Sequence, residues 1–304
     1  MKKVVITGAA GFVGSALTKK LLSENIEVFA IDIKDTIWIE SPLLHYYSCN
    51  IFNSKSIRDI LKTIKDVDVF YHLAWKGSAG PLRNDENCQI ENALCAVSMF
   101  KIADEIGCNK FVFAGTIAEF ETNVAIYEQN TRPQLSYIYG AGKILAHNLL
   151  KPISNSLNTK LVWAYITNAY GVGEKSPRLI NTTISKCIDG VTPTFSSGIQ
   201  NYDFVYIDDV ANAFYLIGKK GLENKGYIIG SGKAQPLKNF LVELVSTCNP
   251  KLKPIFGAVP FTGVNLPLSY FSTDEIKKDC GFEAKISFKE GIKRTYDWLL
   301  EENK

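Results

Sequence analysis

The chain has 304 residues, of which 46% are hydrophobic and 21% are charged, proportions that are typical of a folded globular protein. Its formal net charge of +3 favours neither nucleic acid nor an anionic membrane as the main partner. No uninterrupted apolar stretch approaches the roughly 20 residues that are needed to cross a bilayer.

The first predicted element is a strand, turn and helix over residues 4–21. The β-branched run Val4–Thr7 precedes Gly8, Gly11 and Gly14, and apolar residues then recur on one face of a helix. Gly8 would make the turn, Gly11 would let a pyrophosphate approach the backbone, and Gly14 would let the helix pack closely on the strand. Free N–H groups and the helix dipole favour an anion there. The spacing predicts a phosphate cradle, and the glycines interrupt the apolar run that a signal peptide would need.

The second predicted strand, residues 26–33, carries Asp32 near its end. Asp32 lies about 20 residues beyond the glycine turn, where a carboxylate accepts the hydroxyls of a ribose. A 2′-phosphate on that ribose would be repelled by Asp32, so the sequence favours NAD over NADP. Lys34 would weaken this repulsion, which leaves NADP as the alternative.

Strands and helices alternate as far as residue 166. We expect further strands over 47–51, 67–74, 110–114 and 160–166, and helices that begin at Ser54, run over 86–107 and hold Tyr139 and Lys143. Each crossover is long enough for a helix, which predicts an α/β protein with a doubly wound parallel sheet of the Rossmann type.

The alternation changes beyond residue 171. Strands are expected over 203–207 and 227–230, and helices over 179–189, from 208, around Leu237–Val245 and over 288–300. We interpret residues 1–167 as a dinucleotide-binding domain, to which 203–230 return. Residues 168–304 would mainly form a smaller lobe over the carboxyl ends of the strands, where open sheets bind ligands.

The seven cysteines are scattered and form no Cys-x-x-Cys pair. This distribution indicates reduced thiols and a cytoplasmic location. None of the three histidines pairs with another ligand at metal spacing, so we expect no metal site.

A tyrosine and a lysine, Tyr139 and Lys143, stand four residues apart and therefore on one helix face. A free tyrosine has a pKa near 10, which is too high for a base at neutral pH. A cation held close to the phenolate lowers that pKa. Thr116 follows the strand that precedes this helix and would hydrogen-bond the same substrate oxygen. We therefore predict Thr116, Tyr139 and Lys143 as the catalytic residues.

These features together resemble the extended short-chain dehydrogenase/reductases, which include NAD-dependent nucleotide-sugar epimerases, dehydratases and 4-keto reductases. The resemblance runs from residue 2 to about residue 300 and rests on motifs that occur in one order: Thr7-Gly8-x-x-Gly11-Phe12-x-Gly14, Asp32, His72-Leu73-Ala74, Thr116, Tyr139-x-x-x-Lys143, Asn168-Ala169-Tyr170-Gly171 and Asp203-Phe204-Val205-Tyr206-Ile207-Asp208-Asp209-Val210.

The resemblance implies roles for individual residues. Tyr139 would be the general acid/base, and Lys143 would hold the nicotinamide ribose and lower the pKa of the tyrosine. Residues implied to contact NAD are Gly8, Gly11, Phe12, Val13, Asp32, Asn50, Ile51, Leu73, Ala74, Tyr139 and Lys143. Residues expected at the substrate are Trp75, Arg83, Thr116, Asn168 and Arg178.

Several positions depart from the family pattern. Dehydratases carry an Asp-Glu pair after the Ser/Thr, and 3,5-epimerase/reductases carry a cysteine there, whereas this chain has Ile117 and Ala118. Neither side chain moves a proton, so both reactions are disfavoured. Two arginines of the family are replaced by Tyr165 and Tyr202. The substrate phosphates would then depend on other cations, for which Arg178, Arg83 and Lys186 are the candidates.

The remaining chemistry is hydride transfer at one carbon of a nucleotide-diphosphate sugar. The loop 75–84 and the segment 256–260 are similar to the 6-deoxy-4-ketohexose reductase branch, which favours a 4-keto-sugar reductase of surface-polysaccharide synthesis. An NAD-dependent 4-epimerase, a reductase of a non-nucleotide ketone and a silent NAD(P) sensor are the alternatives. Members of the family that this chain resembles usually form homodimers through two long helices, which correspond to residues near 90–107 and 136–150 here. We therefore expect a homodimer.

Overall fold

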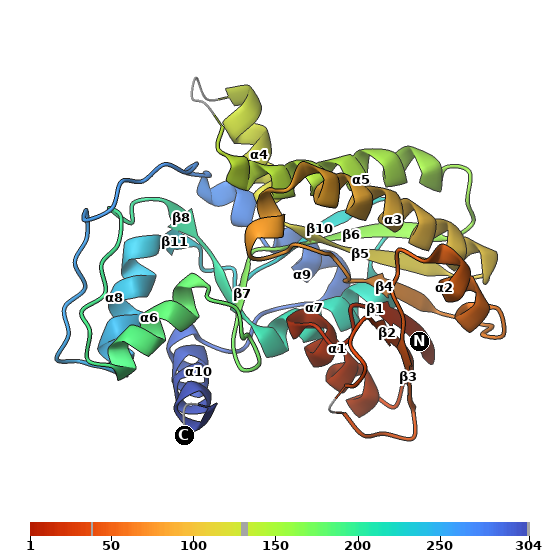
Figure 1. Cartoon of the computed structure of the whole chain (residues 1–304), viewed down its shortest axis with the longest axis horizontal. Coiled ribbons are helices and arrows are strands. Elements are labelled where there is room, and N and C mark those ends of the chain that lie inside the picture. The colour runs from red at the N-terminus through yellow and green to blue at the C-terminus, as the bar shows by residue number, and fades with distance from the viewer. Residues whose placement is uncertain (38, 129–132, 303–304) are drawn as a thin grey trace.

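A parallel sheet between two layers of helices organises the computed structural model, which describes residues 1–37, 39–128 and 133–302 (Figure 1). The strand order is β10-β6-β5-β4-β1-β2-β3, and every neighbouring pair runs parallel. Its strands are β1 (Lys3–Thr7), β2 (Glu27–Asp32), β3 (Leu44–Ser48), β4 (Val69–His72), β5 (Lys110–Thr116), β6 (Lys160–Ile166) and β10 (Gly226–Ile229). The predicted Rossmann-type α/β fold is confirmed.

Helices cover both faces of this sheet. The residues of β1 alternate between two hydrophobic cores, with Val4 and Ile6 in one and Val5 in the other, as expected for a strand buried on both faces. One face is covered by α1 (Phe12–Ser23) and α7 (Ile207–Lys220), and the other by α2 (Ser54–Leu61), α3 (Glu86–Glu105) and α5 (Ile138–Ser154).

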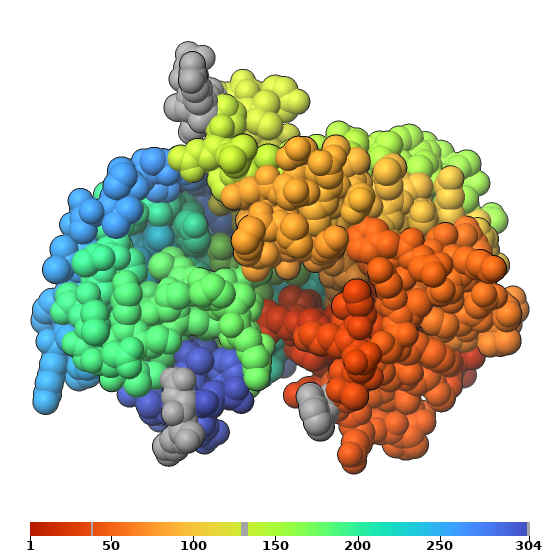
Figure 2. Space-filling view, in the orientation of Figure 1, coloured from red at the N-terminus to blue at the C-terminus, as the bar shows by residue number. Residues whose placement is uncertain are grey.

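A second lobe lies beside the carboxyl ends of the strands. Phe204, Phe240 and Phe288 pack together in its core. Its elements are β7 (Asn168–Tyr170), β9 (Phe204–Tyr206), β8 (Asn201–Tyr202), β11 (Gln235–Pro236), α6 (Leu179–Ile188), α8 (Leu237–Cys248) and α10 (Phe288–Glu302). The molecular surface is hollowed where this lobe meets the sheet (Figure 2).

Shorter elements complete the fold. They are α4 (Ala118–Asn123), the π-helical turn Val124–Glu128, α9 (Asp274–Cys280) and the 3₁₀ turns Pro81–Asn84, Leu135–Tyr137 and Leu268–Phe271. No helix in the described part of the chain has both the length and the apolar character that crossing a bilayer requires.

The third strand was predicted over 47–51, and this prediction is wrong, because β3 ends at Ser48. The chain turns immediately afterwards. The backbone N–H of Asn53 donates to the carbonyl of Asn50 at 3.0 Å, and the Asn53 side chain caps α2 by accepting from Ser56 N–H. The residues expected in the strand are thus used in the entry to the next helix. The strand predicted over 203–207 is present as β9, but it pairs with β7 in a separate two-stranded sheet and does not join the main sheet.

Close contact between β1 and α1 depends on a missing side chain at Gly14. A Cβ there would lie 2.0 Å from the carbonyl oxygen of Gly8, and neither backbone segment yields cheaply. We expect Gly14→Ala to lower the free energy of unfolding by about 1–3 kcal/mol, the usual cost of overpacking.

Thermal denaturation measures this loss, with Ser15→Ala as the control. Ser15 stands in the same helical turn, and its hydroxyl donates to the nearby carbonyl of Phe12 at 3.2 Å. A melting temperature of Gly14→Ala equal to that of Ser15→Ala would contradict the close-packing argument.

Candidate active site

The glycine turn between β1 and α1 has the geometry of an anion cradle. Gly8 has a φ of +77°, and a Cβ on it would meet the backbone nitrogen of Ala74 at 2.6 Å. The helix begins directly afterwards, at Phe12. The N–H groups of a first helical turn have no partner within the helix and favour an anionic ligand.

Asp32 is fixed beside this turn at the end of β2. Its carboxylate accepts the backbone N–H of Ala10 at 2.9 Å and that of Lys34 at 3.1 Å. The ammonium of Lys34 donates to the carbonyl of Ala10 at 2.9 Å. Both charged groups therefore bind Ala10 in the glycine turn, and backbone N–H groups hold the carboxylate in place.

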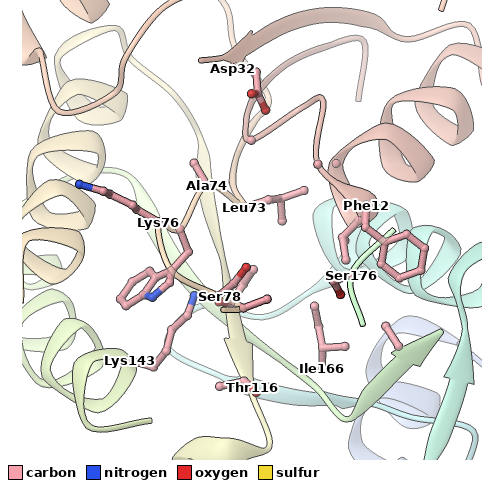
Figure 3. Close-up of a pocket in the computed structure, with 18 of the residues that line it drawn as sticks. Phe12, Asp32, Leu73, Ala74, Lys76, Ser78, Thr116, Lys143, Ile166 and Ser176 are labelled. Atoms are coloured by element: carbon pink, nitrogen blue, oxygen red, sulfur yellow. Dashed lines mark hydrogen bonds between the residues drawn. The ribbon is translucent and has the colours of Figure 1, made fainter. Parts of the chain in front are cut away.

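One cavity of about 580 Å³ extends from Asp32 to Lys143 and Thr116 along the carboxyl ends of the strands (Figure 3). It is lined by all the residues that the family resemblance implies for a dinucleotide: Gly8, Gly11, Phe12, Val13, Asp32, Asn50, Ile51, Leu73, Ala74, Tyr139 and Lys143. The cradle, the acid and the cavity together fit a dinucleotide. The individual contacts stay predictions.

The predicted catalytic residues come from two neighbouring elements. Thr116 ends β5, and Tyr139 and Lys143 lie one turn apart at the start of α5. The two glycines between them let α5 approach its neighbours. A Cβ on Gly140 would lie 2.0 Å from Thr122 Oγ1, and one on Gly142 would lie 2.7 Å from the Cβ of Gln89 on α3.

Tyr139 is buried, and burial raises the pKa of its phenol. The positive charges of Arg83 and Arg178 lower that pKa. The Lys143 ammonium donates to the carbonyl of Ala114 at 2.8 Å and lies 6.0 Å from the centre of the Tyr139 ring. In this arrangement Arg83 is the cation that acts most strongly on the phenol, and the implied effect of Lys143 on the Tyr139 pKa stays a prediction.

Glu119, a buried carboxyl group next to these residues, was not predicted from the sequence. It accepts the backbone N–H of Thr116 at 2.9 Å and the indole N–H of Trp163 at 3.2 Å. Burial raises the pKa of Glu119, whereas burial lowers that of Lys143, with which it interacts. Glu119 does not line the cavity, so it holds the end of β5 and does not face a ligand there. Ile117 and Ala118 are buried and apolar.

The residues expected at the substrate do not all line the cavity. Trp75, Thr116 and Arg178 do. Asn168 does not, and its side-chain amide donates to the carbonyl of Asp203 at 3.3 Å. Arg83 does not line the cavity either. It contacts Tyr139, which does, and its guanidinium carbon lies 3.9 Å from the centre of the Tyr139 ring.

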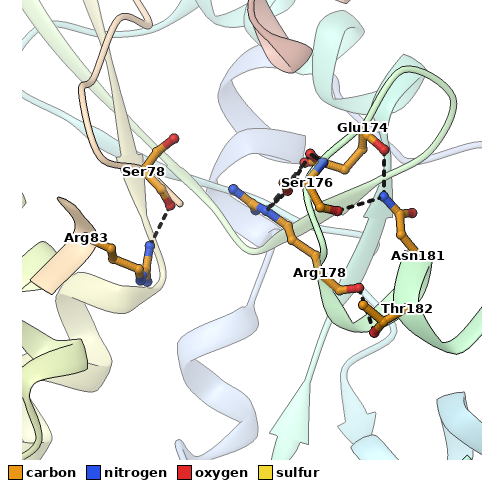
Figure 4. A network of polar contacts seen from close by, with 7 residues as sticks. All are labelled: Ser78, Arg83, Glu174, Ser176, Arg178, Asn181 and Thr182. Atoms are coloured by element: carbon orange, nitrogen blue, oxygen red, sulfur yellow. Dashed lines mark hydrogen bonds and ion pairs between the residues drawn. The ribbon is translucent and has the colours of Figure 1, made fainter. Parts of the chain in front are cut away.

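The two arginines come from different segments, Arg83 from the 3₁₀ turn Pro81–Asn84 and Arg178 from the residue before α6 (Figure 4). Arg83 donates to the carbonyl of Ser78 at 3.0 Å. Arg178 precedes α6, donates to the hydroxyl of Ser176 at 3.2 Å and lies 3.4 Å from the carboxylate of Glu174. Lys186, the third candidate for the phosphates, is exposed on α6 and does not line the cavity.

His72 ends β4 directly before the cavity residues Leu73 and Ala74. Its Nδ1 lies 2.8 Å from the hydroxyl of Thr7 on β1. Burial, with the charge of Lys143, lowers the pKa of His72 to about 3. The imidazole is therefore neutral and joins two strands below the site.

The family model of the NAD dependent epimerase/dehydratase family matches residues 4–230. A dTDP-4-dehydro-6-deoxyglucose reductase of Escherichia coli is 27% identical over 267 residues, 82% of each chain. A putative UDP-glucose 4-epimerase of Methanocaldococcus jannaschii is 26% identical over 99% of each chain. The UDP-glucose 4-epimerase of Thermotoga maritima, solved with UDP-glucose, superposes with a TM-score of 0.81 at 21% identity, and the match covers 99% of this chain and 100% of the other.

The lowered pKa of His72 predicts a specific loss of stability in acid. The unfolded chain binds a proton at this residue below pH ~6.5, and the folded chain does so only near pH 3. The free energy of unfolding should therefore fall by roughly 1.4 kcal/mol per pH unit as the pH drops between these values. His72→Asn, which keeps an acceptor for Thr7, should lack this component.

Urea unfolding of the two proteins between pH 7 and 4 measures the difference, because His45 and His147 are common to both. Parallel pH dependences would show that His72 is protonated in the folded protein.

Proposed function

The chain belongs to the NAD dependent epimerase/dehydratase family, and from this premise we propose that it transfers a hydride at one carbon of a nucleotide-linked sugar. One observation carries the proposal. Thr116, Tyr139 and Lys143 line the same cavity as the glycine cradle and Asp32. A proton-transfer group thus lies at one end of a dinucleotide-sized cleft, at the edge of the sheet where α/β folds bind ligands.

The cofactor is NAD, which supplies a hydride acceptor or donor when it is bound. Gly8, Gly11 and the start of α1 would bind its pyrophosphate. Asp32 would accept the hydroxyls of the adenosine ribose and repel a 2′-phosphate. Lys143 would bind the nicotinamide ribose.

Tyr139 moves the proton in this account. In reduction, its phenol O–H donates to the oxygen of the sugar ketone, and in the reverse direction its phenolate accepts the hydroxyl proton. The hydroxyl of Thr116 donates to the same oxygen and holds it in place. Elimination of water needs a further proton-transfer group, and the adjacent side chains of Ile117 and Ala118 offer none, so dehydration is disfavoured.

A 4-keto-sugar reductase is the reaction we favour. The loop 75–84 is similar to the corresponding loop of 6-deoxy-4-ketohexose reductases, and the E. coli relative is named for such a reduction. A nucleotide-sugar 4-epimerase is the second candidate, supported by the M. jannaschii relative, which matches almost the whole chain. Arg178 in the cavity lining favours a phosphorylated substrate over a non-nucleotide ketone.

We further propose that the second lobe, residues 168–304, binds the nucleotide-diphosphate sugar, and that Arg178 contacts its phosphates. The seven cysteines are all free thiols, which supports a cytoplasmic location. The resemblance to the 6-deoxy-4-ketohexose reductases is our reason for proposing a role in polysaccharide synthesis. Ile90 and Leu94 on α3 are 45% and 56% exposed. These apolar side chains support a homodimer formed through α3 and α5, which light scattering would reveal.

Replacing the proton donor should stop the reaction. Tyr139→Phe removes one hydroxyl and keeps the ring, so we expect turnover to fall by at least about 100-fold, while the affinity for NAD changes little. Steady-state kinetics and NAD titration measure the two quantities. Tyr137→Phe, two residues away, is the matched control, and substantial turnover by Tyr139→Phe would mean that another group moves the proton.

Cofactor turnover separates the two candidate reactions. A reductase releases its oxidised cofactor in every cycle, so the purified protein should carry little NAD and should consume one NADH per sugar reduced. The NAD content of the purified protein and the ratio of NADH consumed to sugar reduced measure the two quantities. Stoichiometric NAD that survives purification, with turnover in the absence of added cofactor, would establish the epimerase instead.

A further inference from the structure

The loop that follows β4, residues 75–84, is held by two buried polar side chains of α3. The Asn92 side chain accepts the backbone N–H of Lys76 at 2.8 Å and donates to the carbonyl of the same residue at 2.8 Å. The Gln89 amide donates to the carbonyl of Leu82 at 2.9 Å. Gln89 and Asn92 are 1% and 2% exposed, so these bonds fix both ends of the loop from within the protein.

Two side chains of the anchored loop contact α5, the helix that carries Tyr139 and Lys143. The Trp75 indole N–H donates to the Gln89 side chain at 2.7 Å, and its ring centre lies 3.8 Å from the Lys143 ammonium. Arg83 follows at the end of the loop, with its guanidinium carbon 3.9 Å from the centre of the Tyr139 ring. Its bond to Ser78 keeps the guanidinium in this position.

Arg83 brings a positive charge to the phenol. Glu121 is the carboxylate that acts on it, but among residues 1–37, 39–128 and 133–302 no carboxylate forms an ion pair with Arg83. Burial lowers the pKa of Arg83, and the neighbouring positive charge of Arg178 lowers it further. A phenolate beneath the guanidinium would relieve both effects.

The charges that face Tyr139 come from four directions. Arg83 from the 75–84 loop and Arg178 from the start of α6 lower its pKa, whereas Glu119 from α4 raises it. Lys143 on the same helix lies 6.0 Å from the ring centre and is bonded to the end of β5. Arg83 is the largest of the lowering influences, and it is the cation in contact with the ring.

We propose that Arg83, held over the Tyr139 ring by the loop that Gln89 and Asn92 anchor, is a positioning residue that stabilises the Tyr139 phenolate and sets the pH range of proton transfer. This role rests on the proposed function of Tyr139 as the acid/base. It differs from the sequence-based expectation, in which Arg83 is a candidate for binding the substrate phosphates and Lys143 lowers the pKa of the tyrosine.

Ultraviolet absorption of tyrosinate tests the proposal without any substrate. Wild-type protein and Arg83→Gln are titrated with base, and the trace of the same protein carrying Tyr139→Phe is subtracted from each. Removing the cation should raise the titration midpoint of Tyr139 by about one pH unit or more. Arg83→Lys, which keeps the charge but loses the planar contact, should restore part of the shift.

Arg58→Gln is the matched control, because Arg58 is an exposed arginine of α2 paired with Glu105, and it should leave the midpoint unchanged. Circular dichroism identifies any variant that fails to fold, in which case Arg83→Lys carries the comparison. The same midpoint in wild-type protein and a folded Arg83 variant would overturn the proposal.

The pH profile of turnover adds a readout that separates this inference from the proposed function. Reduction needs the Tyr139 phenol and oxidation needs its phenolate, so the pKa of Tyr139 sets one limb of the pH profile in either direction. In Arg83→Gln that limb should move to higher pH, because the cation that stabilises the phenolate is gone. A shifted absorption midpoint without turnover of any nucleotide sugar would leave the role of Arg83 intact and contradict the proposed substrate.

Discussion

Burial of one phenol is the constraint on which the site depends. The Tyr139 side chain is 9% exposed, and taking it out of water favours the neutral phenol over the phenolate. A group that must gain and lose a proton in such a place needs positive charge nearby. The protein places Arg83 over the Tyr139 ring, and the charge of Arg178 acts on the phenol as well. The carboxyl group that acts on the phenol belongs to Glu119, which burial tends to neutralise.

The parallel sheet brings these groups together. Strand β5 delivers Thr116 at its carboxyl end, and α5 returns over the same edge with Tyr139 and Lys143. Small residues make this approach close. Gly140 and Gly142 leave room for α4 and α3, as Gly14 does for β1 and α1. The second lobe then closes the cleft from the other side, and Arg178 reaches the cavity from it.

The local features of the site could be predicted from the sequence. The glycine turn, Asp32 and the Tyr139–Lys143 pair each depend on residues that are close in the chain, and the family membership that they suggested is confirmed. The third strand was misplaced because β3 lies at the edge of the sheet and its residues are only partly buried. Its pattern of apolar residues is therefore weak, and the capping role of Asn53 went unrecognised.

The features that were missed depend on contacts between distant parts of the chain. Glu119 is held in the interior by Trp163, 44 residues later, and nothing in the local pattern distinguishes it from a surface glutamate. Gln89 and Asn92 are spaced like residues of one helix face, but their bonds to the preceding loop became visible only in the fold. Arg83 was predicted at the substrate, and its contact with the Tyr139 ring depends on that same loop.

A crystal structure with bound NAD tests the central claim most directly. We expect the hydroxyl of Tyr139 to face the nicotinamide ring, beside the hydroxyl of Thr116, with space for a sugar carbon between the two hydroxyls and the ring. A Tyr139 hydroxyl turned away from the nicotinamide, or sealed off from the cavity, would contradict it.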